Sequence, residues 1–324
     1  MKLVSVTMIK NDGDIVEAFV RHHLSLLDHV VILDHGSTDS TPRILRALQA
    51  ENLRLTVLND DSLSFQQGPR VTELARQAFS RLGADFVLPL DADEFLRVDS
   101  RSVLEEALAG IPAGRCGQIA WRNHVVTEQD DVASLNPVER MKFRASFEPR
   151  EEHKVVLSRT MIEDPRWEVS PGSHYLTRVS PHGTETAVAS YLPTARLAHY
   201  PIRSQEQLHQ KIILGWLAYR LQDPVDIKAA NTSVSADAQF WHWKDLFASI
   251  LNDPVVSTAK LQQYALALYV NKRRISDSNP PMVLTEDPLP THYSLKYTQA
   301  DTGVALASLA RWTDQLLTRV GEML

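Results

Sequence analysis

The sequence predicts an α/β fold: a mostly parallel central sheet with helices on both faces, followed by a helical C-terminal extension. Short β-rich apolar runs alternate with amphipathic stretches of helical spacing through the first hundred residues. Strands separated by helices in this way are joined by right-handed crossovers, which produce a parallel sheet. Polar residues follow several of the apolar runs, where such a sheet places its ligand-binding edge.

The first 90 residues contain four strand patterns and three helix patterns. Thr41 as N-cap and Pro42 at the first helical position mark the start of the second helix. We expect strands at residues 3–8, 30–33, 53–58 and 86–90, and helices at residues 14–28, from 41 onwards, and at 71–82.

Beyond residue 99 the alternation is less regular. A helix is expected at 101–109 and a strand at 118–126. Ser204 followed by Gln207 has the spacing of a capping box, which predicts the start of another helix.

Three cations alternate after residue 139. If Arg140, Lys142 and Arg144 lie in a strand, their side chains share one face. Such a face could bind a phosphate or an acidic acceptor, and it could equally be a solvated edge strand.

The last third of the chain is mainly helical in pattern. A helix is expected at 255–273, and the apolar stripe at 301–324 suits core packing, while leaving a homodimer contact or a peripheral membrane contact open. The proline-rich stretch at 279–290 is expected to be a linker. We therefore expect a catalytic domain over residues 1–220 and a helical extension over residues 221–324.

Bulk composition excludes several classes of protein. Among the 324 residues, 44% are hydrophobic and 23% are charged, as in an average globular protein. The net charge of -6 argues against a protein that binds nucleic acid by general electrostatics. The single cysteine, Cys116, excludes an internal disulfide and fits a reducing compartment. With no apolar run of about 18 residues and no signal-peptide pattern, a cytoplasmic location is expected.

The acids after the fourth predicted strand are the first candidate site. Side chains two apart in an extended chain point the same way, so Asp91 and Asp93 are expected to converge. Two carboxylates form part of a Mg²⁺ or Mn²⁺ site, since these ions keep water and substrate phosphate as further ligands. An acidic turn is the plainer alternative. Polar loops at residues 11–14 and 34–39 fall on the same predicted edge and favour the site.

Several motifs together resemble one enzyme family. The motifs are Lys10-Asn11-Asp12, Asp34-His35-Gly36-Ser37-Thr38-Asp39-Ser40-Thr41, Gly83-Ala84-Asp85-Phe86, Asp91-Ala92-Asp93-Glu94-Phe95, Trp121, Glu139-Arg140, Gly172-Ser173-His174 and His199-Tyr200-Pro201-Ile202-Arg203-Ser204. With this set the chain resembles the family-two-like glycosyltransferases of GT-A fold, in particular a bacterial subgroup, over about residues 1–220.

The resemblance implies a nucleotide-diphosphate sugar as donor and a hydroxyl of a glycan or glycolipid as acceptor, usually with inversion at the anomeric carbon. Asp34 would contact the uracil or ribose, and Asn11 would lie beside the nucleotide. Ser37 and Asp39 belong to the same donor-binding loop, and Asp91 would reach the donor sugar or ribose.

The resemblance also implies Mn²⁺ or Mg²⁺ at the diphosphate. Asp93 would bind this metal together with Asp91, and His199 would complete its shell. A strand-end histidine bonded to the backbone is the alternative for His199. His174 is a further candidate for the same role.

An inverting transfer needs a base that takes the acceptor proton. Glu139 is the candidate by position, although it could instead form a surface ion pair with Arg140. Asp130 and Asp131 are also placed late enough in the chain, whereas Glu94 lies very near the expected metal.

Two other functional classes fit the pattern less well. A nucleotidyltransferase needs a glycine-rich, basic phosphate loop, which the first predicted loop lacks. A phosphoryl-transfer hydrolase would carry its acids after the first strand. A non-catalytic nucleotide- or carbohydrate-binding protein on the same scaffold is the remaining alternative, because no base is evident.

Overall fold

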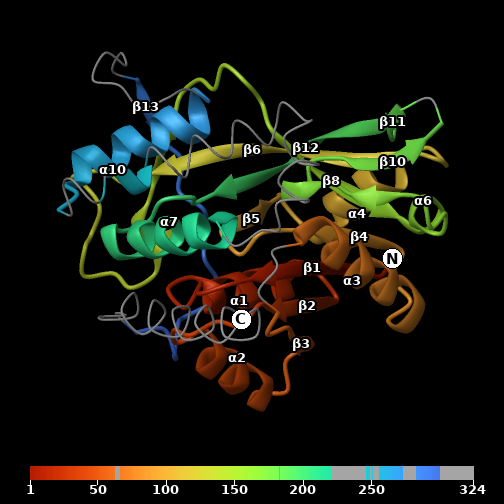
Figure 1. Cartoon of the computed structure of the whole chain (residues 1–324), viewed down its shortest axis with the longest axis horizontal. Coiled ribbons are helices and arrows are strands. Elements are labelled where there is room, and N and C mark those ends of the chain that lie inside the picture. The colour runs from red at the N-terminus through yellow and green to blue at the C-terminus, as the bar shows by residue number, and fades with distance from the viewer. Residues whose placement is uncertain are drawn as a thin grey trace, which may run out of the picture.

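The computed structural model describes residues 1–62, 66–181, 183–220, 246–248, 250, 255–272 and 282–299. Within these residues the chain forms one large sheet, whose N-terminal half is parallel (Figure 1). Its four adjacent parallel strands are, in spatial order, β3 (Leu55–Asn59), β2 (His29–Asp34), β1 (Leu3–Ile9) and β4 (Phe86–Pro89).

The same sheet continues beyond β4 through antiparallel pairs, in the order β8 (His153–Ser158), β6 (Cys116–Val125), β7 (Phe143–Ala145) and β13 (Leu284–Glu286). In addition, β12 (Ala189–His199) pairs in parallel with β6 and antiparallel with β5 (Glu94–Arg97).

Helices cover both faces of the parallel strands, because successive apolar residues of each buried strand point to opposite faces of the sheet. Leu3 and Ile9 of β1 pack in the core that contains the apolar faces of α1, α2 and α4. Val4 and Val6 pack on the opposite face, against α3 and α6. The bounds are α1 (Val16–Leu26), α2 (Thr41–Ala50), α4 (Arg101–Ala109), α3 (Gln67–Arg81) and α6 (Arg159–Ile162). The predicted α/β class, with helices on both faces, is confirmed.

The segment of alternating cations is not a single strand, so the condition for a shared face of Arg140, Lys142 and Arg144 is not met. Arg140 ends a short helix, α5 (Pro137–Arg140), and only Arg144 lies in a strand, β7. The Asn136 side chain accepts a hydrogen bond from the Val138 amide at 3.2 Å, and Pro137 follows it at the first helical position. This start signal outweighs the alternation of charge.

The predicted linker is also partly ordered structure. β13 pairs with β7 at the outer edge of the sheet, the position where flanking prolines are tolerated. The predicted boundary at residue 220 stays a prediction, and the stripe at 301–324 lies outside the described residues.

The remaining elements surround the late strands. Ser204 Oγ accepts the Gln207 amide at 3.1 Å, which confirms the predicted helix start. These elements are the small sheet β9 (Glu168–Val169), β10 (Leu176–Ser180) and β11 (Gly183–Thr186), the turn η1 (Pro171–Ser173), α7 (Gln205–Arg220), α10 (Thr258–Ala265) and η2 (Leu266–Val270).

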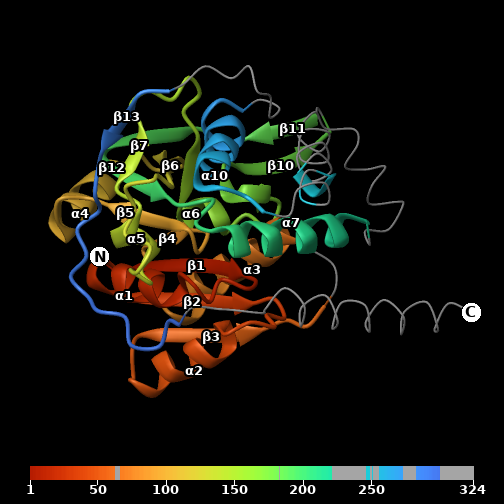
Figure 2. The same cartoon turned by 90° about the vertical axis from the view of Figure 1, so that its left-hand side faces the viewer.

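Residues 287–299, which we name the C-terminal strap, run from β13 along one side of the molecule to α1 and α2 (Figure 2). Glu17 of α1 is fully buried, and its carboxylate accepts the amides of Lys296 and Tyr297 at 2.8 Å and of Thr298 at 2.9 Å. Arg21 donates to the same carboxylate at 2.9 Å. The carboxylate of Glu17 thus fixes the end of the strap on α1.

No helix in the described part of the chain combines the length and the apolar character that crossing a membrane would require.

Candidate active site

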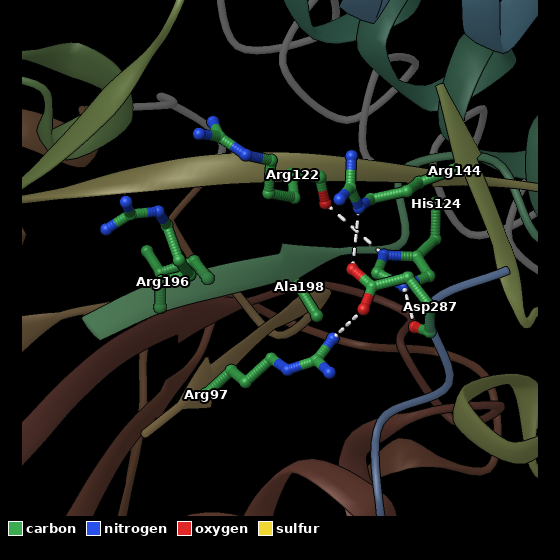
Figure 3. A pocket seen from close by; sticks show the side chains of 8 residues that line it. Arg97, Arg122, His124, Arg144, Arg196, Ala198 and Asp287 are labelled. Atoms are coloured by element: carbon green, nitrogen blue, oxygen red, sulfur yellow. Dashed lines mark hydrogen bonds and ion pairs between the residues drawn. The ribbon is translucent and has the colours of Figure 1, made fainter. Parts of the chain in front are cut away.

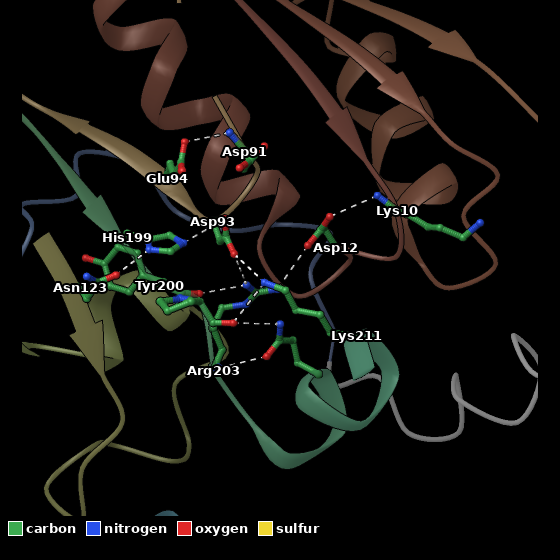
Figure 4. A network of polar contacts seen from close by, with 12 residues as sticks. Lys10, Asp12, Asp91, Asp93, Glu94, Asn123, His199, Tyr200, Arg203 and Lys211 are labelled. Carbon is green, nitrogen blue, oxygen red and sulfur yellow. Dashed lines mark hydrogen bonds and ion pairs between the residues drawn. The ribbon is translucent and has the colours of Figure 1, made fainter. Parts of the chain in front are cut away.

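The acids after β4 lie in a tight turn that gives them different surroundings (Figure 4). The Glu94 amide donates to the Asp91 carbonyl at 3.0 Å, and the Asp91 amide donates to the Glu94 carboxylate at 3.0 Å. Asp93 is 7% exposed and Glu94 is fully buried. Because the chain turns here, Asp91 and Asp93 are directed to different partners.

Asp93, Glu94 and His199 form the one group of metal-type donors found among the described residues. Their donor atoms all lie within 4.8 Å of one another. His199 ends β12 and is the register partner of Glu94 in β5, while His199 Nε2 lies 3.7 Å from Asp93 Oδ1. Two carboxylates and an imidazole suit a divalent cation such as Mn²⁺.

The imidazole of His199 is held in the tautomer that a metal ligand needs. Its Nδ1 lies 2.7 Å from Asn123 Oδ1, an acceptor, so Nδ1 carries the proton and Nε2 presents its lone pair to Asp93. Asn123 is fixed in turn by Glu148, which accepts the Asn123 side-chain amide at 2.6 Å and its backbone amide at 2.8 Å. Burial lowers the pKa of His199 to about 3, so the ring is neutral at pH 7.

Two cations approach the other oxygen of Asp93. Lys211 Nζ lies 3.2 Å and Arg203 Nη1 3.7 Å from Asp93 Oδ2. Burial alone would raise the pKa of Asp93, but the charges of Lys211 and Arg203 outweigh it and hold that pKa well below its usual range. Asp93 is therefore ionised at neutral pH, as a metal ligand must be.

Arg203 also connects this site to the loop after β1. It is 2% exposed and binds both oxygens of Asp14, at 2.6 and 2.8 Å, and one oxygen of Asp12 at 3.4 Å. Burial raises the pKa of Asp12 to about 7, although Arg203 acts in the opposite direction.

A buried lysine lies between the other two acids. Lys154 of β8 is 1% exposed, and its ammonium lies 2.6 Å from Asp91 Oδ2 and 3.2 Å from Glu94 Oε1. Burial raises the pKa of Glu94 well above its usual range, and Lys154 opposes this shift. Gln67 donates to Asp91 at 3.0 Å. Asp91 therefore pairs with Lys154, whereas Asp93 pairs with Lys211 and Arg203.

The loops after β1 and β2 are joined through the side chains expected to bind the nucleotide. Asn11 has a φ of +58°, and its Oδ1 accepts the Thr38 amide at 2.7 Å. Ser37 Oγ accepts the Asn11 amide at 2.8 Å, and the Ser37 amide donates to Asp34 Oδ1 at 3.0 Å. Burial raises the pKa of Asp34. These contacts fix the shape of the loops at the edge where the acids lie.

Asp39 performs the same task from the other side of the loop. Its carboxylate accepts the amides of Gly13 and Thr41, both at 2.9 Å.

The other candidate residues form hydrogen bonds with groups outside the set of Asp93, Glu94 and His199. Glu139 accepts the Thr291 hydroxyl of the C-terminal strap at 2.8 Å. His174 Nδ1 lies 2.9 Å from the His153 carbonyl. Asp130 accepts the Thr127 hydroxyl at 2.7 Å, and Asp131 accepts the Ala133 amide at 3.0 Å.

Trp121 forms a wall of the site. Its ring centroid lies 4.4 Å from that of His199 and 5.2 Å from that of His174, and Lys154 and Lys272 both lie over its ring. In the part of the chain that the structure describes, the buried Trp121 Nε1 has no hydrogen-bond partner. A buried donor of this kind is costly unless a ligand or water binds to it.

Sequence reasoning missed the cations of the site. Lys154 had a recognisable signal, since it is a lone charge at the start of the apolar run Val155-Val156-Leu157. Arg203 lies two residues before α7 and Lys211 lies within it, and only the folded chain shows that both face Asp93.

No family model matches the sequence, and no curated protein matches it either. Solved structures to which the chain is similar include S. aureus TarS, residues 1–349, with 14% identity, a TM-score of 0.36, and coverage of 77% of this chain and 72% of that chain. Mannosyltransferase PcManGT from Pyrobaculum calidifontis, in complex with GDP-Man and Mn²⁺, has 15% identity, a TM-score of 0.37, and coverage of 83% and 81%. GalNAc-T7 with UDP, GalNAc and Mn²⁺ has 12% identity, a TM-score of 0.34, and coverage of 61% and 43%.

Proposed function

We propose that this protein is a metal-dependent glycosyltransferase of GT-A fold, which moves a sugar from a nucleotide-diphosphate donor to a hydroxyl of a glycan or glycolipid. The observation that carries the proposal is the buried group of Asp93, Glu94 and His199 at the carboxyl edge of the sheet, with His199 already in its ligand tautomer. The motif resemblance described above gives the substrate class.

The donor set fits a divalent metal. Asp93 and His199 would hold it, with Glu94 beside them, and a bound Mn²⁺ or Mg²⁺ would neutralise charge on the diphosphate. Asp93 directs Oδ1 toward His199 and Oδ2 toward Lys211, so one carboxylate serves both the metal position and the cations.

The chain supplies positive charge of its own where the leaving group would lie. Lys211 and Arg203 are fixed beside Asp93, and fixed cations stabilise the negative charge that develops on a departing diphosphate. Both cations are already ordered by carboxylates, so little reorganisation is needed when the donor binds.

The nucleoside and the donor sugar would lie along the edge toward β2. In this proposal Asp34 and Asn11 contact the nucleoside in the loop shaped by Ser37 and Asp39, and Asp91 contacts the ribose or sugar. Glu139 stays the candidate base for an inverting transfer.

Calorimetric titration with UDP and GDP, each with and without Mn²⁺, tests the proposal. Binding of at least one nucleotide should require the metal and should be lost in Asp93→Asn. Asp99→Asn is a matched control, because Asp99 is exposed in the loop before α4. Absence of metal-dependent binding of either nucleotide would refute the proposal.

Sugar transfer is then assayed with nucleotide-diphosphate sugars of the nucleotide that binds. Hydrolysis or transfer that is lost in Asp93→Asn supports the enzyme. Metal-dependent binding with no turnover on any acceptor would instead favour the non-catalytic binding protein.

A further inference from the structure

A polar cavity lies on the face of β12 opposite to the candidate active site. Its volume is about 190 Å³, the space of roughly six waters at ~30 Å³ each. The lining residues are Arg97, Arg122, His124, Arg144, Arg196, Leu197, Ala198 and Asp287 (Figure 3). We name this cavity the arginine pocket.

Each of four adjacent strands contributes one arginine to the arginine pocket. Arg97 of β5 is the register partner of Arg196 of β12, and Arg122 of β6 is the partner of Ala198, two residues further along β12. Arg144 of β7 is the partner of His124 in β6. Since side chains two apart share a face, these registers place all four arginines on one face.

The carboxylate in the pocket leaves much of this charge uncompensated. Asp287 binds both Arg97 and Arg144, the latter at 2.6 Å. Glu151, which does not line the pocket, binds Arg122 at 2.6 Å. Four arginines and these two carboxylates leave a charge of +2, and burial lowers the pKa of His124, which keeps that ring neutral at pH 7.

The Arg196 guanidinium is positioned by uncharged groups rather than by a carboxylate. Its guanidinium donates to the carbonyls of Pro193 and Ala195, both at 2.8 Å, and lies over the Tyr191 ring. Such contacts fix the planar group without occupying it with a bound carboxylate. A fixed guanidinium is well suited to bidentate binding of an oxyanion.

The arginine pocket is distinct from the candidate active site, although the two share strands. Arg122 and Ala198 face the pocket, and their immediate neighbours Asn123 and His199, which are register partners, face the metal-type donors. The sheet itself therefore separates the two sites.

We propose that the arginine pocket binds the phosphate group of a phosphate monoester, supplied by a small molecule or by a lipid headgroup. The charge of +2 matches a phosphate monoester, which carries about −1.5 to −2 at pH 7. A monocarboxylate would leave part of the arginine charge unpaired. The pocket has room for the phosphate and a few neighbouring atoms.

Calorimetric titration of the full chain with inorganic phosphate, without divalent metal, tests this site. Saturable binding should weaken roughly 10-fold or more in Arg196→Gln, because charge-assisted hydrogen bonds to the phosphate are lost. Arg122→Gln tests the same pocket from β6, and thermal melting establishes that each variant is folded. Arg46→Gln is the matched control, since Arg46 is exposed on α2.

Lys211→Gln separates this proposal from the proposed function. Phosphate binding that survives in Lys211→Gln and is lost in Arg196→Gln supports the arginine pocket, whatever the outcome with nucleotides. The proposal is overturned if wild type does not bind phosphate, or if Lys211→Gln abolishes binding while Arg196→Gln and Arg122→Gln leave it intact.

A second arm identifies the source of the phosphate. Sedimentation with phosphatidylcholine vesicles that contain phosphatidic acid should be Arg196-dependent if the ligand is a lipid. Phosphate binding without vesicle binding indicates a soluble phosphate monoester.

Discussion

Replacement of Asn123 by leucine should weaken Mn²⁺ binding although Asn123 is not itself a donor in the metal group. Asn123 is 1% exposed, and its Oδ1 holds His199 Nδ1 at 2.7 Å. Leucine has a similar size but cannot accept this hydrogen bond. The imidazole would then lose the partner that fixes its tautomer and orientation.

The size of the effect follows from the contacts that are lost. The backbone amide of residue 123 still donates to Glu148, so the strand stays in register. Only the three side-chain contacts of Asn123, with His199, Glu148 and the Tyr269 carbonyl, disappear. Loss of the group that orients a metal-bound histidine costs about 10–100-fold in affinity, which is about 1.4–2.7 kcal/mol.

Calorimetric titration of Mn²⁺ into the wild type and Asn123→Leu measures this difference. Asp93→Asn gives the affinity without the metal carboxylate, and Gln49→Leu on the exposed face of α2 controls for an added apolar side chain. Equal Mn²⁺ affinities in the wild type and Asn123→Leu, with binding lost in Asp93→Asn, would show that His199 needs no orientation by Asn123.

Three further predictions concern stability. Glu17→Gln should lower the free energy of unfolding by about 3 kcal/mol, because it breaks a buried ion pair. A loss of less than ~1 kcal/mol in that free energy, measured by urea denaturation, would contradict this. Burial lowers the pKa of His22 to about 4, whereas a histidine in the unfolded chain has a pKa of ~6.5. Between these two pH values the unfolded chain therefore binds more protons than the folded chain. The free energy of unfolding should fall by up to about 3 kcal/mol as the pH drops from 6.5 to 4. Urea denaturation across this range should show a shallower decline in His22→Gln, and an equal decline would refute the assignment. Lys154→Met leaves Glu94 and Asp91 without their cation and should lower the melting temperature, whereas an unchanged melting curve would show that the lysine is not structurally needed.

The fold of the first hundred residues was predictable because its signals are local. Short apolar runs and helical spacing predicted the first four strands and their helices, and the helix at 101–109 was predicted with its observed bounds. Because ligands bind at the carboxyl edge of a parallel sheet, Asp93 could also be predicted to lie at that edge.

The rest of the site depends on pairings between distant residues. Lys154 and Lys211 meet the acids of the 91–94 turn from β8 and α7, and no local pattern encodes these contacts. Asp91 and Asp93 were expected to converge because an extended conformation was assumed for residues 91–93. The hydrogen bond between the Asp91 amide and the Glu94 carboxylate instead stabilises a turn, and Asp91 binds Lys154.

The C-terminal strap sets an order for the completion of this domain. Glu17 receives its bond from the Thr298 amide across a separation of 281 residues. At a synthesis rate of about 5–20 residues per second, these residues take roughly 14–56 s to make. During that time Glu17 of α1 lacks the three strap amides that hydrogen-bond its carboxylate in the folded chain. A nascent chain should therefore keep this side of α1 hydrated and protease-sensitive until synthesis has passed the strap.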